Sequence, residues 1–290
     1  MQKVLISLKN LFNTCMSFEN YPKNIGKILE KATFSQDQLE SLKNNLSKKV
    51  IIRVYGLAGV GKGTLSESLA KSLQIPNLES SMILRIATFG YLKLGLELSD
   101  LNTQKVFEKI DIKVVDNSLE FYFENKFVDR KSLKNPVIDK NVTDFSSDLF
   151  VRQKFDDTLD NLVQKVFKTA VVADGRGAFE PYLLKAEKSG FKIIRVLLDS
   201  SDEIKAKRYY RGFIKSEKAK NPDFDEKVIN KQEFLKEFEK TVVQRNQKDI
   251  TNILDKKIGL ISKDSGLIET SNLSPQEVLE TTLDFIAKSL

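Results

Sequence analysis

A run of small and basic residues at positions 56–64 has the composition of a site for phosphate groups. It reads Gly56-Leu57-Ala58-Gly59-Val60-Gly61-Lys62-Gly63-Thr64 and follows a β-branched segment, residues 50–55. A glycine loop between a strand and a helix points several backbone N–H groups at one place, where the positive end of the helix dipole also lies. Lys62 can reach the outer phosphates of a nucleoside triphosphate, and the Thr64 hydroxyl can join the shell of a metal ion. We therefore expect ATP and Mg²⁺ here, with the triphosphate bound by Gly56, Gly59, Gly61, Lys62, Gly63 and Thr64.

The loop departs from the usual pattern at one position. Ser or Thr normally follows the lysine directly, whereas Gly63 separates Lys62 from Thr64. The alternative interpretation is an ordinary turn from strand to helix. The strand before the loop and the helical spacing of apolar residues over 64–73 favour the phosphate-binding interpretation.

The other predicted elements indicate what holds this loop in place. We expect further strands at residues 112–115, 120–123, 169–173 and 192–198, with helical segments between several of them. The segment 169–173 is apolar without alternation, which is typical of a parallel strand covered on both faces. Repeated strand–helix alternation predicts a three-layer α/β fold around a parallel sheet.

Composition excludes several classes of protein. The chain has 290 residues, no histidine and a single cysteine, Cys15, which excludes histidine triads, an internal disulfide framework and a four-thiolate zinc site. One cysteine also favours a reducing compartment, so we expect a cytoplasmic location. No run approaches the about 18 apolar residues of a membrane helix, and the start of the chain lacks a signal-peptide pattern.

The charge is basic but evenly spread. A net charge of +7 arises from 47 basic and 40 acidic residues, interleaved along the chain. This pattern fits a solvated surface, or a cleft that attracts polyphosphates. We find neither a nucleic-acid-binding module nor interleaved aromatic and basic residues, and we expect no nucleic-acid partner.

Several further motifs resemble those of bacterial cytidylate kinases. The loop has the Gly-x-x-Gly-x-Gly-Lys-Gly-Thr form of nucleoside monophosphate kinases, and Ala173-Asp174-Gly175-Arg176 resembles the family's Asp-Gly-Arg segment. Residues 269–278 resemble its C-terminal Asp-Ser-Thr-x-Leu-Ser-x-x-Glu-Val segment, which lies near the adenine in family members. The resemblance covers most of residues 50–290. It implies a P-loop kinase fold with a monophosphate-binding insert and a helical lid.

The acceptor side of the resemblance is less complete. Matching residues are Ser80, Arg85, Arg152, Arg245 and Asp249. At the positions that read the cytosine, Gly177 replaces an aspartate and Asn252 replaces an arginine; Glu79 also replaces an aspartate at the start of the monophosphate site. Phosphoryl transfer to a monophosphate is therefore better supported than cytosine specificity.

The resemblance assigns roles to individual residues. Arg85, Arg152 and Arg176 would grip the acceptor phosphate, since an arginine can hold two phosphate oxygens at once. Ser80, Arg245 and Asp249 would contact the acceptor, Arg208 and Arg211 would come from the lid, and Thr270 and Ser271 would lie beside the adenine. Asp174 would hold Mg²⁺ through water, together with Thr64. The catalytic set is Lys62, Arg176, Asp174 and Arg208.

Each role has a simpler alternative. Asp174 could be a turn residue at the end of a strand, and Ser80 could cap the helix that follows it. The predicted helix over 202–210 presents Lys205 and Arg208, and its lysines also fit a plain basic surface.

We expect two parts in the chain. Residues 1–47 carry helical periodicity, including Ile28 and Leu29, and form a helical N-terminal extension. Residues 48–290 form the kinase-like domain, with the insert at about 96–160 and the lid at about 202–248.

The expected reaction is phosphoryl transfer from ATP to CMP or dCMP, with UMP as a further candidate. The alternatives are a kinase for another small acceptor, and a degenerate nucleotide-binding regulatory module. We expect a monomer whose partners are small nucleotides and whose extension contacts either another protein or the kinase domain itself.

Overall fold

The structure is a computed structural model that describes residues 27–46, 49–167, 169–175, 181–230, 233–234 and 265–290. Three of the expected site residues, Arg176, Arg245 and Asp249, lie outside these ranges. Within them, none of the helices combines the length and apolar character needed to cross a membrane.

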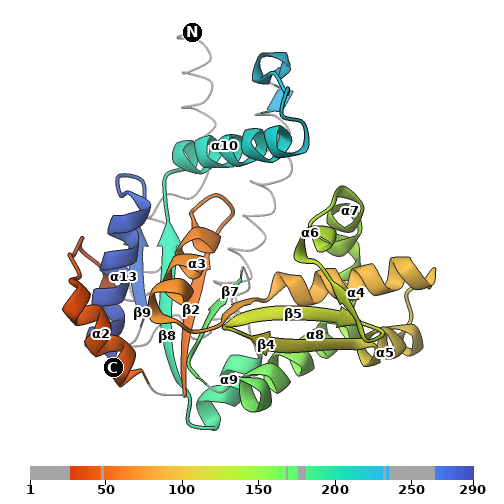
Figure 1. Ribbon diagram of the computed structural model, residues 1–290, viewed down its shortest axis with the longest axis horizontal. Helices are drawn as coiled ribbons and strands as arrows, with labels where there is room; N and C mark the ends of the chain where they lie inside the picture. The colour runs from red at the N-terminus through yellow and green to blue at the C-terminus, as the bar shows by residue number, and fades with distance from the viewer. Residues whose placement is uncertain (1–26, 47–48, 168, 176–180, 231–232, 235–264) are drawn as a thin grey trace.

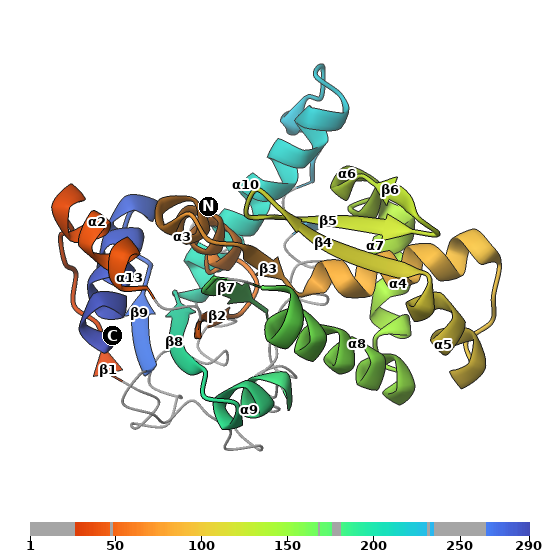
Figure 2. The ribbon, with the colours of Figure 1, turned by 60° about the horizontal axis from the view of Figure 1, so that its bottom comes forward.

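The core is a six-stranded sheet in which all neighbouring strands run parallel. Its order is β1-β9-β8-β2-β7-β3, and Figure 2 shows this succession from one edge to the other. The strands are β1 (Lys27–Ile28), β9 (Ser265–Glu269), β8 (Lys192–Asp199), β2 (Val50–Gly56), β7 (Val171–Asp174) and β3 (Asn77–Glu79). Every residue of β2 is buried, because the strand is central and covered on both faces. The expected strands over 50–55 and 192–198 are thus confirmed, and the strand expected over 169–173 exists at 171–174.

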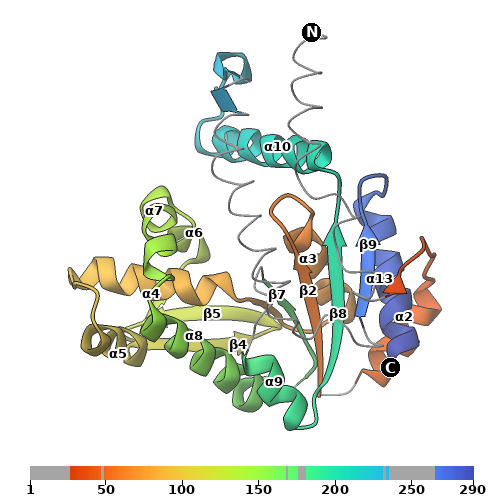
Figure 3. The same ribbon diagram turned by 180° about the vertical axis from the view of Figure 1, so that it is seen from behind.

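Helices cover both faces of this sheet and make it the middle of three layers (Figures 1 and 3). Successive residues of β2 alternate between two hydrophobic clusters, Ile51 in one and Ile52 in the other. The cluster of Ile52 includes α2 (Gln36–Asn45), α3 (Lys62–Leu73) and α13 (Pro275–Ser289). The cluster of Ile51 includes α4 (Ser81–Leu94), α8 (Leu149–Asn161) and α9 (Pro181–Lys188). The expected three-layer α/β fold is confirmed.

The region between α4 and α8 forms a separate substructure beside the sheet. It contains α5 (Asp100–Glu108), β4 (Ile110–Val115), β5 (Ser118–Phe123), β6 (Lys126–Val128), α6 (Arg130–Leu133) and α7 (Pro136–Phe145). The strands expected at 112–115 and 120–123 exist, but they belong to a three-stranded antiparallel sheet, β4-β5-β6, and not to the parallel one. Two-residue turns at Asp116–Asn117 and Glu124–Asn125, all with positive φ, fit the tight connections of such hairpins.

The long helix α10 (Asp202–Lys220) follows β8 and crosses the carboxyl ends of the strands (Figure 1). A short 3₁₀ helix, Glu226–Val228, comes after it. The expected helix over 202–210 is therefore confirmed and continues for another ten residues, from 211 to 220.

The described part of the N-terminal extension packs against the rest of the chain. The prediction of a helix around Ile28 and Leu29 is wrong, because Lys27–Ile28 forms a strand along β9 and the Leu29 N–H donates to the Leu267 carbonyl at 2.9 Å. Residues 36–45 are helical as expected, with Ser35 and Gln38 in a capping box. Of the two contacts expected for the extension, the structure shows the one with the kinase-like domain itself.

Candidate functional site

The glycine loop connects β2 to α3 at the carboxyl edge of the sheet. Gly56, Gly59 and Gly61 have φ of +146°, +84° and +100°, values that residues with side chains rarely adopt. A Cβ atom on Gly56 would lie 2.6 Å from the Leu198 carbonyl oxygen, and one on Gly59 would lie 2.8 Å from that of Lys205. The loop backbone therefore packs directly on β8 and α10. Gly61 caps α3 without a side-chain bond, which leaves the first N–H groups of the helix available to an anion.

Lys62 and Thr64 lie on the first turn of α3. The Lys62 ammonium donates to the Leu57 carbonyl at 2.7 Å, so its side chain folds back over the loop that it is expected to serve. Thr64 is exposed. The Lys62 side chain is thus on the loop side of the helix, and Thr64 lines the same cavity as Gly59 and Gly61.

Asp174 ends the strand next to this loop, paired with Val54 of β2. Burial raises the pKa of its carboxyl group. The positive charge of Arg53 opposes that rise, the negative charge of Glu79 adds to it, and Lys62 acts in the same direction as Arg53. The Asp174 carboxyl group is therefore largely removed from water and feels the positive charge of Lys62. A cation bound nearby would stabilise its ionised form.

Asp174 and Thr64 fit the kind of magnesium site that a nucleotide brings with it. Mg²⁺ in kinases is held by one or two protein groups, several waters and the substrate phosphates, and it needs no dedicated cage of ligands. Among the described residues no group of three or more acidic or thiol side chains could hold a metal by itself. A single carboxylate at the end of β7 and a hydroxyl on α3 match that requirement.

A cavity of about 700 Å³ lies beside the loop, between α10 and the segment that joins β9 to α13. Part of its wall is apolar, including Ile204, Leu273 and Val278, as suits a nucleobase. Of the residues expected to bind ATP, the cavity brings together Gly59, Gly61, Thr64, Arg208, Arg211, Thr270 and Ser271. They come from three chain segments that are far apart in the sequence.

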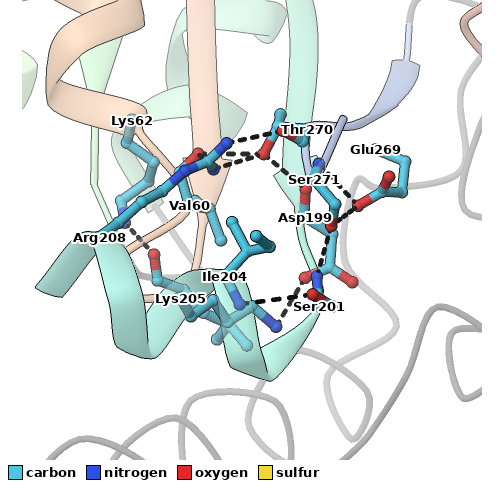
Figure 4. A network of polar contacts seen from close by, with 11 residues as sticks. Val60, Lys62, Asp199, Ser201, Ile204, Lys205, Arg208, Glu269, Thr270 and Ser271 are labelled. Carbon is cyan, nitrogen blue, oxygen red and sulfur yellow. Dashed lines mark hydrogen bonds and ion pairs between the residues drawn. The ribbon is translucent and has the colours of Figure 1, made fainter. Parts of the chain in front are cut away.

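Arg208 joins these three segments (Figure 4). Its guanidinium donates to the Thr270 carbonyl at 2.7 Å, to the Thr270 hydroxyl at 2.8 Å and to the Val60 carbonyl at 3.2 Å. Ser271 continues the network, because its hydroxyl accepts from the Ser201 N–H at 2.8 Å and donates to Glu269 at 2.5 Å. In this arrangement Arg208 links the glycine loop to the β9–α13 segment.

On the acceptor side, Ser80 and Asp174 come together. The Ser80 hydroxyl is buried and donates to the Asp174 carbonyl at 2.7 Å. Ser80 precedes α4 but makes no side-chain capping bond to it, so the simple capping alternative is not what the structure shows. Glu79, which directly precedes Ser80, forms ion pairs with Arg130 at 2.6 Å and with Lys134 at 3.1 Å.

The two described acceptor arginines are held by the insert. Arg85 of α4 donates to the Leu133 carbonyl at 2.8 Å and pairs with Asp139 at 2.5 Å. Arg152 of α8 is exposed, and its Nε donates to the Ser146 carbonyl at 2.5 Å. The structure therefore places both arginines in contact with residues of the insert, while Arg176, Arg245 and Asp249 lie outside the described residues.

Sequence reasoning missed several charged residues at this edge of the sheet. Arg53 of β2 is fully buried, stacks 4.8 Å from the centre of the Tyr55 ring and reaches Gly175, where a Cβ atom would lie 2.4 Å from its Nη2. The sequence did contain a sign of this buried charge, because Arg53 is the one charged residue in the β-branched run before the loop. Arg130 and Lys134 gave no such signal, because their partner Glu79 is about fifty positions away. Lys205 was expected to be presented by its helix, and the structure instead buries it.

The family model and the curated relatives indicate the same family. The family model described as cytidylate kinase matches residues 52–288. The cytidylate kinase of Carboxydothermus hydrogenoformans is 28% identical over 243 residues, which cover 82% of this chain and 97% of the relative. The cytidylate kinase of Rickettsia bellii is 25% identical over 254 residues, which cover 86% and 98%. Among solved structures, a gluconokinase from Sinorhizobium meliloti 1021 aligns with a TM-score of 0.41 and 13% identity, over 84% of this chain and 94% of that one.

Proposed function

The chain belongs to the cytidylate kinase family of ATP-dependent kinases, and we propose that it transfers the terminal phosphoryl group of ATP to CMP or dCMP, with UMP as the next candidate. The observation that carries the proposal is the meeting of two half-sites at the carboxyl edge of the sheet. The glycine loop and the 700 Å³ cavity lie on one side. On the other side are Asp174, at the end of the strand next to the loop, and Ser80, whose hydroxyl donates to the Asp174 carbonyl.

In this proposal the donor nucleotide binds in the cavity with its phosphates on the loop. Backbone N–H groups of the loop and of the first turn of α3 hold the phosphate oxygens. Lys62 exchanges the Leu57 carbonyl for a phosphate oxygen, which places its charge where the transferred group loses its bond to ADP. Asp174, through water, and Thr64 would hold Mg²⁺, which would neutralise negative charge on the phosphate oxygens. Arg208 and Arg211 approach from α10, and Thr270 and Ser271 lie beside the base.

The acceptor binds on the side of the insert. Arg85, Arg152 and Arg176 grip its phosphate, and Ser80, Arg245 and Asp249 contact its phosphate or ribose. Transfer between two polyanions depends mainly on positioning and charge neutralisation, which is the work that a set of arginines performs well. Gly177 and Asn252 stand where the family reads cytosine, and they make the choice of acceptor the point to test.

The test is coupled ADP release with ATP and a panel of acceptors. The panel contains CMP, dCMP, UMP, AMP, GMP and small phosphate-accepting alcohols such as gluconate and shikimate. We expect the highest kcat/KM with CMP or dCMP. Lys62→Ala should lower kcat by roughly 100-fold or more. Lys71→Ala, at an exposed position near the end of the same helix, is the matched control and should leave kcat unchanged.

Two results would change the conclusion. Clear preference for an acceptor that is not a pyrimidine monophosphate would replace CMP by that acceptor. Absence of acceptor-dependent ADP release over the whole panel, from protein that binds ATP, would support the alternative of a nucleotide-binding regulatory module.

A further inference from the structure

A buried ion pair lies directly behind the donor cavity. Lys205 Nζ lies 2.9 Å from Asp199 Oδ1, and the two side chains are only 2% and 3% exposed. Lysine and aspartate are almost never buried to this extent unless they are paired. Figure 4 shows the pair on the side of α10 that faces the end of β8. It therefore belongs to the interior of the donor half-site and not to its solvent-facing wall.

Asp199 connects two of the three segments that build the cavity. It is the last residue of β8, and its side chain holds Lys205 in the first turn of α10. Its backbone carbonyl accepts from the Thr270 N–H at 2.8 Å and from the Thr270 hydroxyl at 2.9 Å. One residue thus fixes both α10 and the start of the β9–α13 segment relative to the sheet.

Lys205 connects α10 to the third segment, the glycine loop. The Lys205 carbonyl oxygen lies 2.8 Å, and its Cα 3.2 Å, from where a Cβ atom of Gly59 would be. Only the absence of a side chain at Gly59 permits this approach. Arg208 lies three residues further along the helix, on the same side of it, and there it reaches Val60 and Thr270. The orientation of the first turn of α10 therefore decides both how the loop is supported and where Arg208 points.

An ion pair is a specific way to hold this turn. Burying two charges costs desolvation free energy that their attraction often only offsets, so such a pair is weak evidence for stability. It does select one geometry, because the ammonium must stay on the carboxylate. An apolar pair could pack the same space while allowing α10 to rotate or slide.

We propose that Asp199 and Lys205 are a positioning pair for the donor nucleotide, which holds the first turn of α10 against Gly59 so that the ATP cavity is preformed. The proposal deepens the proposed function, since it assumes that the cavity binds ATP. It assigns to the pair no contact with the nucleotide. Its effect passes through the backbone of Gly59 and through the side chain of Arg208.

The test compares ATP binding and stability in variants of the pair. Lys205→Met should raise the Kd for ATP, measured by calorimetry without an acceptor, by about tenfold or more, and should raise the KM for ATP in parallel. The KM for the acceptor, measured at saturating ATP, should stay within about twofold of the wild type. Lys205→Arg keeps the charge and should recover most of the affinity.

The paired apolar variant, Asp199→Leu with Lys205→Met, removes both charges and avoids leaving one unpaired, so it keeps the protein folded if the single variant does not. Its Kd for ATP should still be raised.

A second ion pair on the same strand provides the matched control. Arg195 of β8 pairs with Glu187 of α9 at 2.6 Å, and the Arg195 side chain is only 6% exposed, but the pair lies toward the other end of the strand. Arg195→Met should lower the melting temperature and leave the Kd for ATP unchanged. The proposal is overturned if the paired apolar variant binds ATP within twofold of the wild type, or if Arg195→Met weakens ATP binding equally. Because binding is measured without an acceptor, failure to phosphorylate CMP would refute the proposed function and leave this result intact.

Discussion

At the scale of single residues, Asp156 of α8 should make the free energy of unfolding depend on pH. Burial raises the pKa of its carboxyl group to about 6, Arg152 opposes that rise, and Asp157 adds to it. A carboxyl group with a raised pKa contributes stability below its ordinary pKa, and loses that contribution as the pH rises through about 6. At pH 8 the folded protein therefore holds an ionised carboxylate in a position where the neutral form is preferred.

We predict that Asp156→Asn raises the free energy of unfolding at pH 8 and has little effect at pH 3.5, which is below the ordinary pKa of an aspartate. Because the group is only half-buried and solvent screens it, the gain should be about 1 kcal/mol, less than the full shift would give. Urea denaturation of the variant and the wild type at the two pH values measures this. Asp144→Asn is the control, at an exposed position on α7 whose charge does not contribute to the raised pKa of Asp156. An equal gain at both pH values would mean that the ionisation of Asp156 is not its cause.

Residues differ in how far the sequence reveals their roles. The glycine loop could be predicted because its function depends on local spacing, and the structure shows Gly59, Gly61 and Thr64 lining one cavity as that spacing implies. Arg53 and Lys205 could not be placed in the same way. Whether a charged side chain is buried depends on partners contributed by other elements, which neighbouring residues in the sequence do not reveal.

At the scale of elements, the N-terminal segment shows why helical periodicity can mislead. Lys27–Ile28 is a strand because it pairs with the edge of β9. Two residues are too few to show a strand pattern in the sequence, so this pairing could not be predicted. Helix α2 was predicted correctly because Leu39, Leu42 and Leu46 recur at helical spacing, and the structure adds a capping box at its start. Its Leu42 is 3% exposed and belongs to the cluster that includes α3 and α13. The family match begins at residue 52, so α2 lies outside the matched region although it packs on the helix that follows the glycine loop.

If α2 is an integral part of the core, then Leu42→Ala should destabilise the whole domain. Removing a buried leucine side chain costs about 3 kcal/mol, since the cavity only partly collapses. Chemical denaturation should show one cooperative transition shifted to lower denaturant concentration. Leu149→Ala, at a leucine that is 86% exposed, should shift it by less than about 0.5 kcal/mol. A loss below about 1 kcal/mol for Leu42→Ala would indicate that α2 detaches without consequence for the core.

At the scale of the whole molecule, the two halves of the site are built differently. The three layers and the parallel sheet follow from strand–helix alternation, so the fold class could be predicted. The donor half consists of loops at the ends of neighbouring parallel strands, where ligands of such sheets usually bind. The acceptor half depends on the insert, whose ion pairs to Glu79 come from about fifty residues further along the chain. The insert also contains an antiparallel sheet where the sequence predicted further strands of the parallel one. Short apolar strands look alike in the sequence whether they pair in parallel or in hairpins.

This construction predicts that ATP stabilises the whole molecule and not only the loop. Helix α3 and the loop share one cluster with α2 and α13, so unfolding of the core removes the donor site. At about 100 times its Kd, a ligand that binds only the folded state adds about 2.7 kcal/mol to the free energy of unfolding. For a domain of this size, that raises the melting temperature by roughly 5–10 °C. Thermal denaturation with and without ATP and Mg²⁺ measures the shift, which Lys62→Ala should largely abolish and the control Lys71→Ala should retain. If ATP raised the melting temperature of Lys62→Ala as much as that of the wild type, the nucleotide would be binding somewhere other than the glycine loop, and the donor half of the site would have to be placed elsewhere.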